Sequence, residues 1–367
     1  MGEPLKYMYN SQFFEHLCPV IKEVVPDFGE RRFVYSVFDK TWPDLELKQR
    51  TRQVTKALGE CLPSDYPKAI EMVVNICRLL QNRKGTLLPT YPLIFLPDYV
   101  EQYGMDHFEL SMHAIEESTK LVSAEFAIRP FIAKYPSETM AMMLKWSKNS
   151  HAAVRRLSSE GCRPRLPWGM GLPFLKKDPS PILPILENLK TDPSDSVRRS
   201  VANNLNDIAK DHPEIALRIS QQWKGTGSET DWIIKHGCRT LLKRGNAKVL
   251  TLHGFNPKAR GRIKNLKISE KVRIGESLNF QFEFMNSEKS STRYRIDYII
   301  DYLTRSGNIS TKIFKLTEYR FEPGQQLLFK RKKSFANFST RIHFKGHHQL
   351  RIMANGVELA ARKFIVH

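Results

Sequence analysis

The sequence predicts a multidomain protein in which an all-α repeat solenoid is followed by an all-β sandwich. Up to about residue 250, apolar residues recur with the spacing of helices, and beyond that point they alternate with polar residues in short runs. Between the two regions, "GFNPKARGRIKN" at residues 254–265 has the Gly, Pro and Lys/Arg content typical of a linker. We therefore expect a helical domain over residues 1–255 and a β domain over residues 256–367.

Three segments of the helical half resemble one another, at residues 137–161, 180–213 and 212–245. Each has the pattern of a helix, a short turn and a second helix. Placing Val154, Val197 and Ile234 in register gives periods of 43 and 37 residues, within the range of HEAT or armadillo helical pairs. The first domain is therefore predicted to be a HEAT-like-repeat α-solenoid with a concave inner surface.

A basic residue follows the apolar anchor in each of these repeats. Polar residues are needed on any exposed helix face, but that need does not explain the same sign of charge at the same place three times. Because a regular row of cations matches a polyanion, we expect the row to contact phosphates. Its members are Arg155 and Arg156, Arg198 and Arg199, and Lys235 and His236.

The second half shows alternating runs typical of strands, such as "SLNFQFEFMN" at 277–286 and "VELAARKFIV" at 357–366. "ANGV" at 354–357 contains the Asn-Gly pair of a type I′ hairpin. About seven short strands without intervening helices predict an immunoglobulin-like (Ig-like) sandwich, although the Cys-Trp-Cys signature is missing. The basic runs "KARGRIK" at 258–264 and "KRKKS" at 330–334 are expected to be loops.

The charge distribution points to an anionic partner. The formal net charge is +20, and it divides into −3 for residues 1–144, +9 for residues 145–255 and +14 for residues 256–367. A solubilising surface needs no such gradient, so we favour a binding face, with nucleic acid ahead of a membrane surface. We expect a monomer without membrane attachment.

Several classes of protein are excluded by missing patterns. The five cysteines are scattered and never in C-x-x-C spacing, which argues against a disulfide framework, a zinc site or an iron–sulfur cluster. No phosphate-binding loop, nucleophile elbow or H-E-x-x-H motif occurs. We therefore expect neither a metal nor a cofactor. The amino terminus lacks an apolar signal region, so we expect a cytoplasmic, nucleoid-associated protein of bacterial type.

Specific motifs resemble a known family over essentially the whole chain. They are "EPLKYMYN" at 3–10, "SAEFAIRPFI" at 123–132, "HAAVRRLSSEGCRPRLPWG" at 151–169, "DSVRRSVANNLNDIAKDHP" at 195–213 and "DWIIKHGCRTLLKRG" at 231–245. With the β domain, these segments resemble the AlkC branch of the HEAT-like-repeat alkylpurine DNA glycosylases, in the subgroup with a C-terminal Ig-like domain.

The resemblance implies a monofunctional N-glycosylase that acts in base-excision repair. Its substrates would be cationic N3-alkylated bases in duplex DNA, 3-methyladenine and 3-methylcytosine, excised with little or no base flipping and without metal or cofactor. Carried over by motif, Glu125 and Glu160 would be the acidic pair and Trp168 the aromatic wall of the active site. As a hypothesis, Glu125 activates the attacking water.

The resemblance also implies a set of residues that contact the DNA backbone: Arg155, Arg156, Arg163, Arg165, Arg198, Arg199, Asn203, Lys235, His236, Arg239 and Lys243. From the residues alone, other interpretations stay open. Either glutamate is more often an ordinary salt-bridged helix residue, and a tryptophan such as Trp168 more often belongs to a core. The chain as a whole could be a non-catalytic nucleic-acid-binding solenoid or, less well supported by its charge, a protein scaffold.

Overall fold

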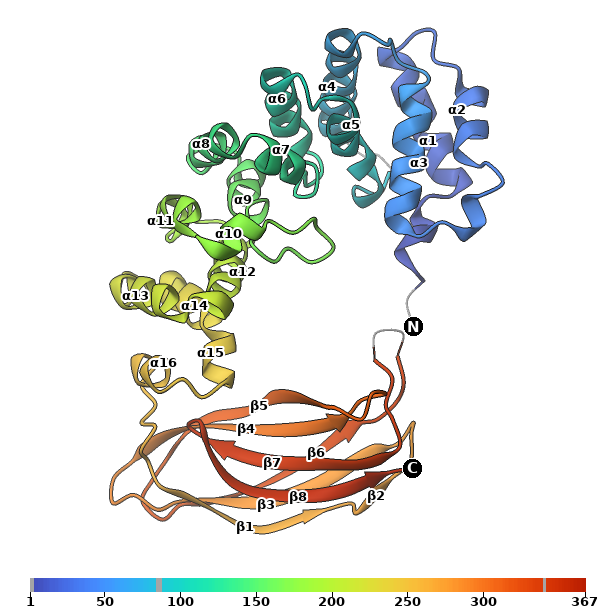
Figure 1. The fold of residues 1–367 in the computed structure, drawn as a ribbon. Coiled ribbons are helices and arrows are strands. Elements are labelled where there is room, and N and C mark those ends of the chain that lie inside the picture. The colour runs from blue at the N-terminus through green and yellow to red at the C-terminus, as the bar shows by residue number, and fades with distance from the viewer. Residues whose placement is uncertain (1–2, 84–87, 339–340) are drawn as a thin grey trace. The chain divides into compact units, whose positions relative to one another are not determined.

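The computed structural model describes residues 3–83, 88–338 and 341–367 of the chain (Figure 1). The chain divides into two compact units. The first comprises Met1–Asp211 with Gly225–Ile234, and the second comprises His212–Lys224 with Lys235–His367.

The first unit is helical throughout its described part. Its main helices are α1 (Ser11–Val24), α2 (Glu30–Val37), α3 (Leu47–Gly59), α4 (Tyr66–Asn82), α5 (Phe95–Tyr103), α6 (Phe108–Thr119), α7 (Ile128–Lys134), α8 (Pro136–Trp146), α9 (Ala152–Glu160), α10 (Pro173–Lys177), α11 (Leu183–Leu189) and α12 (Asp195–Asp211). Helix α14 (Ser228–Gly237) spans the division between the units, and helix α13 (Pro213–Trp223) belongs to the second unit.

The helices of the three predicted pairs are all present: α8 and α9, α11 and α12, and α13 and α14. The residues used to align them, Val154, Val197 and Ile234, are 0%, 0% and 1% exposed. Each anchor is therefore a core residue of its repeat, and the predicted repeat solenoid is confirmed.

Helix α12 shows how one repeat is fastened to the next. Its apolar residues Val197, Val201, Leu205 and Ile208 recur at helical spacing and are all buried. The same helix makes polar contacts with α9: Asn204 Nδ2 donates to the main-chain oxygen of Ser159 at 2.7 Å, and the hydroxyls of Ser159 and Ser200 lie 2.6 Å apart. These buried hydrogen bonds fix the register of α12 on α9, which carries the candidate site.

The second unit contains a β-sandwich, as predicted. Its strands are β1 (Gly261–Ile268), β2 (Lys271–Val272), β3 (Ser277–Asn286), β4 (Thr292–Leu303), β5 (Ile309–Phe321), β6 (Gln326–Ser334), β7 (Gly346–Ala354) and β8 (Val357–Val366). One sheet has the order β1-β3-β6 and the other the order β2-β8-β7-β4-β5. Alternate residues of β3, from Leu278 to Phe284, are buried between the sheets.

The predicted type I′ hairpin is confirmed between β7 and β8. Its two turn residues, Asn355 and Gly356, have φ angles of 46° and 84°, the left-handed values that this turn requires. The turn also meets the helical segment of the same unit, because a Cβ on Gly356 would lie 2.8 Å from the Cα of Gly245. The hairpin and the short helices α15 (Arg239–Lys243) and α16 (Ala247–Leu252) therefore approach each other at backbone distance.

Of the two basic runs predicted as loops, one lies in a strand and the other lies in a strand over its second half. "KRKKS" forms the end of β6, where Leu278 to Phe282 of β3 pair with Lys333 to Phe329, and "KARGRIK" runs into β1. The run of basic residues in β6 shows no alternation of apolar and polar residues in the sequence. The reason is that β6 is an edge strand, whose basic side chains reach solvent on both faces of the sheet.

The change from helices to strands falls between Leu252 and Gly261. A domain boundary at residue 255 stays a prediction, since the compact units group α13, α15 and α16 with the sandwich. None of the helices in the described part of the chain is long and apolar enough to cross a membrane.

Candidate active site

Both predicted carboxylates lie in the first unit, on neighbouring elements. Glu125 occupies the turn before α7, and Glu160 is the last residue of α9. Arg156, one helical turn before Glu160, lies between them: its Nη1 donates to Glu125 Oε2 at 2.9 Å, and its Nη2 lies 3.9 Å from Glu160 Oε2. The fold therefore brings the two carboxylates to the same guanidinium group.

The charges continue in alternation beyond Glu160. Arg163 Nη1 donates to Glu160 Oε1 at 2.6 Å, and Arg163 Nε donates to Asp207 Oδ2 of α12 at 2.9 Å. Burial lowers the pKa of the Arg163 guanidinium, but the adjacent carboxylates of Glu160 and Asp207 raise it more, so the net shift is upward. We call this row, from Glu125 through Arg156, Glu160 and Arg163 to Asp207, the charge ladder.

The charge ladder changes the interpretation of Arg163. This residue is only 7% exposed, and its guanidinium is shared between two carboxylates. A contact with a DNA phosphate would require Arg163 to leave Glu160 and Asp207, and the phosphate contact stays a prediction. The observed contacts of Arg163 hold Glu160 in place.

The two candidate carboxylates differ in their access to water. The side chain of Glu160 is 6% exposed and faces an arginine with each oxygen, whereas that of Glu125 is 19% exposed. Among the described residues, Glu125 accepts hydrogen bonds from Arg156 and from the hydroxyl of Ser123, each at 2.9 Å, and both go to Oε2. Glu125 is thus the better placed of the two to meet a water molecule.

Trp168 is not a core residue. Its side chain is 66% exposed, on the loop between α9 and α10, and its φ of 61° lies in the left-handed region that few tryptophans adopt. Strain of this kind, at about 1–3 kcal/mol, persists only where neighbouring contacts impose it. Two cationic side chains, Lys48 and Arg129, provide such contacts.

Arg129 holds the Trp168 loop from inside the protein. It lies on α7, is fully buried, and donates to three main-chain oxygens of the loop: Gly161 at 2.7 Å, Arg163 at 2.9 Å and Met170 at 2.6 Å. Burial lowers the pKa of Arg129 to about 10. A Cβ on Gly169 would come within 3.2 Å of this side chain, which accounts for a glycine beside Trp168.

Lys48 holds the same loop from the side of α3. Its Nζ donates to the main-chain oxygen of Trp168 at 2.5 Å and lies 4.5 Å from the centre of the Phe126 ring. One cation therefore contacts the loop of Trp168 and the residue next to Glu125.

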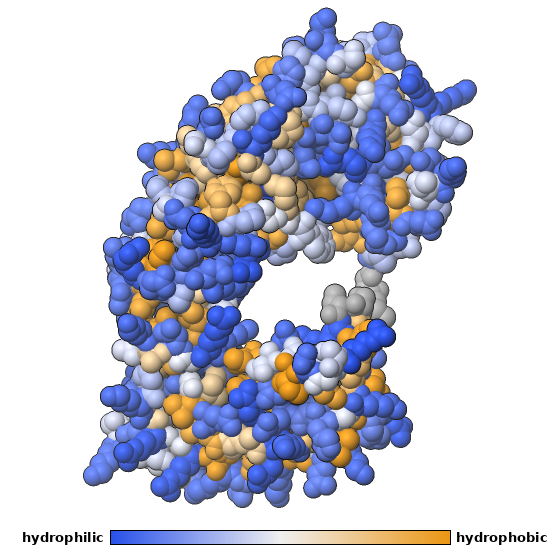
Figure 2. Space-filling model, viewed as in Figure 1, coloured by the Kyte–Doolittle hydropathy of each residue, from blue (hydrophilic) through white to orange (hydrophobic). Residues whose placement is uncertain are grey.

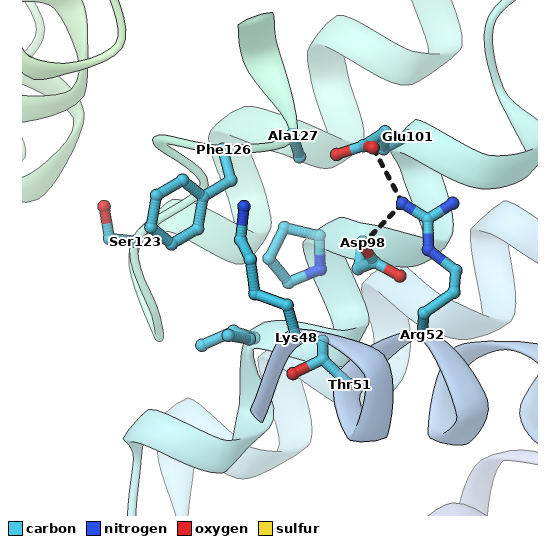
Figure 3. Close-up of a pocket in the computed structure, with 10 residues that line it drawn as sticks. Lys48, Thr51, Arg52, Asp98, Glu101, Ser123, Phe126 and Ala127 are labelled. Atoms are coloured by element: carbon cyan, nitrogen blue, oxygen red, sulfur yellow. Dashed lines mark hydrogen bonds and ion pairs between the residues drawn. The ribbon is translucent and has the colours of Figure 1, made fainter. Parts of the chain in front are cut away.

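A pocket of about 120 Å³ lies beside Lys48, and Figure 3 shows its lining. Ser123 and Phe126, on either side of Glu125 in the sequence, form one wall, and Arg52 pairs with Asp98 and Glu101 at 2.9 and 2.7 Å on the other. Burial raises the pKa of both carboxyls. The pocket adjoins the turn that carries Glu125.

Replacing Lys48 by Met should slow the base excision that the motif resemblance implies about 10- to 100-fold, because the Trp168 loop is then no longer held from the side of α3 and small displacements at a reacting centre are costly. The measurement is a single-turnover excision rate at saturating protein, with affinity for undamaged duplex measured separately. Lys48→Arg should retain more activity than Lys48→Met. Lys56→Met, two turns along the same exposed helix face, is the matched control; equal decreases in both methionine variants would contradict the role.

In the first two repeats, the first of the two adjacent arginines donates hydrogen bonds to main-chain oxygens just before its own helix. Arg155 Nη1 donates to the main-chain oxygens of Asn149 and Ser150, and Arg198 Nη1 donates to those of Asp192 and Pro193. In both cases the acceptors lie six and five residues earlier in the sequence. These two arginines therefore have a structural role in common, which is to hold the turn between the two helices of their repeat. Phosphate contact by these two arginines stays a prediction.

Of the other predicted DNA-contact residues of the first unit, Arg156 contacts Glu125 and Glu160 and its phosphate contact stays a prediction. Three others are at least partly exposed. Arg165 pairs with Asp211 at 2.6 Å and Arg199 with Asp195 at 2.6 Å, on side chains that are 40% and 65% exposed. Asn203 is half-buried on α12. Exposed ion pairs of this kind are weak, so both arginines can exchange their carboxylates for phosphates.

Four predicted DNA-contact residues lie in the second unit. Lys235 forms an ion pair with Glu318 of β5, and Arg239 Nη1 donates to the main-chain oxygen of His236 at 2.7 Å. Lys243 is exposed at the end of α15. The structure thus divides the predicted contacts between the units, with all the candidate catalytic residues in the first.

Sequence reasoning missed four residues of the site: Lys48, Phe126, Arg129 and Asp207. Phe126 and Arg129 stand in the same motif as Glu125, and Asp207 lies within the second repeat, so the motifs contained a signal for these three. Lys48 had none, because it lies 120 residues from its acceptor. In the described ranges, no group of three or more His, Cys, Asp or Glu residues is arranged to hold a metal ion.

Together, the helical repeats and the β-sandwich define a HEAT-like-repeat protein with a C-terminal Ig-like domain. Residues 182–212 match the HEAT repeat family, and residues 262–367 match the family described as "Uncharacterised protein YhaZ, C-terminal Ig-like domain". The Bacillus subtilis (strain 168) protein described as "Uncharacterized protein YhaZ" is 42% identical over 353 residues, 96% of each chain.

A solved structure, the Pseudomonas fluorescens alkylpurine DNA glycosylase AlkC bound to DNA containing an abasic site analog, is 35% identical with a TM-score of 0.93 and complete coverage of both chains. The chain therefore belongs to the AlkC family of alkylpurine DNA glycosylases, in the subgroup with an Ig-like domain.

Proposed function

We propose that this protein is a monofunctional DNA glycosylase that hydrolyses the N-glycosidic bond of cationic N3-alkylated bases, 3-methyladenine and 3-methylcytosine, in duplex DNA. The observation that carries the proposal is that Arg156 contacts both carboxylates, Glu125 and Glu160. The exposed Trp168 follows Glu160 in the same segment of the chain. The DNA-bound relative supports DNA as the partner. We further propose that the protein acts as a monomer, in the cytoplasm, with little or no base flipping.

The charge of the lesion determines what the site has to supply. An N3-alkylated adenine or cytosine carries a positive charge, so its departure from the sugar releases a neutral base. No general acid is therefore needed to protonate the leaving group. The site must instead stabilise the sugar, which becomes an oxocarbenium-like cation in the transition state.

The two carboxylates suit different parts of that task. Glu160, fixed by Arg163 and Arg156, supplies negative charge that needs no rearrangement when the sugar becomes cationic. Glu125 is more exposed and accepts its hydrogen bonds on Oε2, which leaves Oε1 for the attacking water. This assignment of Glu125 as the water-activating residue is supported by its exposure.

The aromatic residues suit a cationic base. The exposed ring of Trp168 can lie against the lesion or the sugar, and a cation over an aromatic face gains about 0.5–2 kcal/mol. Phe126 already accepts one cation, Lys48, on its ring. The rings of Trp168 and Phe126 can thus attract positive charge, although the surrounding residues that we propose to bind phosphates are basic.

The decisive experiment incubates the protein with methylated duplex DNA and identifies the released bases by chromatography and mass spectrometry. Release of 3-methyladenine and 3-methylcytosine by the parent, abolished in Glu125→Gln but kept in the exposed control Glu138→Gln, supports the proposal. Both variants should bind DNA as the parent does, with affinity that falls steeply with salt. Salt-sensitive binding without release would instead identify a non-catalytic DNA-binding protein.

A further inference from the structure

The outward face of the three-stranded sheet carries five cations that the proposed site does not use. Along β3, Asn279, Gln281 and Glu283 point away from the buried Phe280 and Phe282, so their cross-strand neighbours share the outward face. The cations among those neighbours are Lys264 and Lys267 on β1 and Lys330 and Lys332 on β6. Together with Arg262 of β1, which pairs with the next outward residue of β3, Met285, we call them the outer cations.

A β-bulge keeps the outer cations of β1 on one face. The register shifts between Lys264 and Lys267, where Asn265 has a φ of 54° and donates to Glu283 Oε1 at 3.2 Å. If the same residues of β1 ran in strict alternation, with no bulge, Lys267 would turn toward the core and Leu266 toward solvent. The bulge instead packs Leu266 on the core and places Lys267 opposite Gln281, in line with Lys330.

The outer cations lack acidic partners. All five are exposed, and in the part of the chain that the structure describes none of them forms an ion pair, while Glu283 is the single acidic residue on this face. By contrast, two arginines on the outward face of the five-stranded sheet are paired, Arg351 with Asp301 and Arg295 with Asp297, both at 2.8 Å. The three-stranded face therefore has a net positive charge that its own sheet does not neutralise.

The geometry of this face suits a row of phosphates. Cations two residues apart on a strand are about 6.8 Å apart, and those on β1 and β6 are separated by two strand spacings of about 4.8 Å. Such separations are within one Debye length, so the outer cations act as one field. Between them lies a shallow depression of about 560 Å³, with neutral hydrogen-bonding groups from Ser269, Asn279 and Gln281 beside Lys267, Lys330 and Lys332.

The face points away from the predicted DNA contacts of the same unit. Lys235 reaches the five-stranded sheet through Glu318, which lies on that sheet's outward side beside Arg295. Since the two sheets pack face to face, their outward sides point in opposite directions. Figure 2 shows hydrophilic side chains along the edge of the sandwich where Figure 1 places β1 and β3.

We propose that the outer cations bind the phosphate backbone of a second segment of duplex DNA, separate from the segment held at the candidate active site. The proposal rests on the proposed function only in taking Lys235, Arg239 and Lys243 as contacts of the first segment. A single stiff duplex cannot lie on both outward faces of one sandwich, because its persistence length is about 500 Å. One chain would thus bridge two duplex segments.

The test is a bridging assay with the full chain and undamaged DNA. One duplex is immobilised, a second, fluorescent duplex is free, and the fluorescence captured per protein chain is measured. The parent should capture the second duplex, and a quadruple variant with Lys264, Lys267, Lys330 and Lys332 changed to Gln should capture at least about tenfold less while still binding the immobilised duplex. The salt dependence of capture should flatten by about 0.9 in log–log slope for each phosphate that the variant no longer neutralises.

A matched control removes the same charge elsewhere in the second unit, by changing four other exposed lysines to Gln: Lys248, Lys271, Lys289 and Lys345. This control should still bridge. No capture by the parent, an equal decrease in both variants, or bridging complexes that contain two protein chains by sedimentation would overturn the proposal. So would aggregation of the quadruple variant with unchanged capture, because the lysines would then serve only to keep edge strands apart.

The assay is independent of excision. Undamaged DNA contains no substrate, so a failure to release bases in the glycosylase experiment leaves the bridging result intact. Absence of bridging together with normal excision of methylated bases by the parent would overturn only the second DNA surface.

Discussion

Glu160→Gln is expected to lower the single-turnover rate of base excision by about 100- to 1,000-fold while leaving the affinity for duplex DNA within about twofold of the parent. Removal of one preorganised electrostatic group typically has this effect on the chemical step. Glu160 is buried and reaches no solvent-side phosphate, so binding should not depend on it. Gln has the same shape, and Arg163 keeps its second partner, Asp207, at 2.9 Å.

The control for this variant is Glu138→Gln, an exposed glutamate in the first turn of α8. Circular dichroism and thermal unfolding establish that both variants are folded. If Glu160→Gln retains the excision rate of the parent, the buried carboxylate is a structural member of the charge ladder only. If affinity and excision fall together, the residue acts through binding or folding, and its catalytic assignment is wrong.

Arg129→Met is expected to lower the free energy of unfolding by about 3 kcal/mol and to abolish most excision. The substitution keeps an unbranched apolar stem but removes the guanidinium, which leaves the main-chain oxygens of Gly161, Arg163 and Met170 without their donor, and each buried group left unpaired costs about 1–3 kcal/mol. Relief of the buried charge offsets part of that sum. Denaturant unfolding and single-turnover excision measure the two effects.

Arg129→Lys separates charge from geometry in the same position. An ammonium group keeps the positive charge but cannot donate to three oxygens in the planar arrangement of a guanidinium, so this variant should be intermediate in stability and poor in excision. Arg218→Met, on an exposed position of α13, is the control. Unchanged stability in Arg129→Met would show that the Trp168 loop is held by other contacts.

Much of the architecture followed from local patterns in the sequence. The apolar anchors Val154 and Val197 are core residues as their spacing predicted, because burial of one helix face imposes a period near 3.6 residues. The hairpin at Asn355 and Gly356 was also predictable, since few residue pairs accept two positive φ angles in succession. The end of strand β6 was predicted to be a loop because its basic side chains reach solvent on both faces of an edge strand, so its sequence does not alternate between apolar and polar residues.

The candidate site was predictable only in part. Glu125, Glu160 and Trp168 came from motif resemblance, and composition alone favoured ordinary salt bridges and a core tryptophan. Arg163 shows the limit of that approach, because the resemblance implies a phosphate contact for it but does not indicate its burial between two carboxylates. Burial depends on what packs over a side chain, and α12 provides that cover from 44 residues away in the sequence.

The sequence by itself determined the two-part organisation, the repeat pairs, the hairpin and the gradient of positive charge, all of which depend on neighbouring residues or on sums over segments. The tertiary structure alone decided that Lys48 meets Trp168, that Arg129 holds the loop from inside, and that a bulge at Asn265 keeps the outer cations on one face. Those outcomes depend on contacts between residues far apart in the chain or on a single backbone angle, and neither leaves a periodic trace in the sequence.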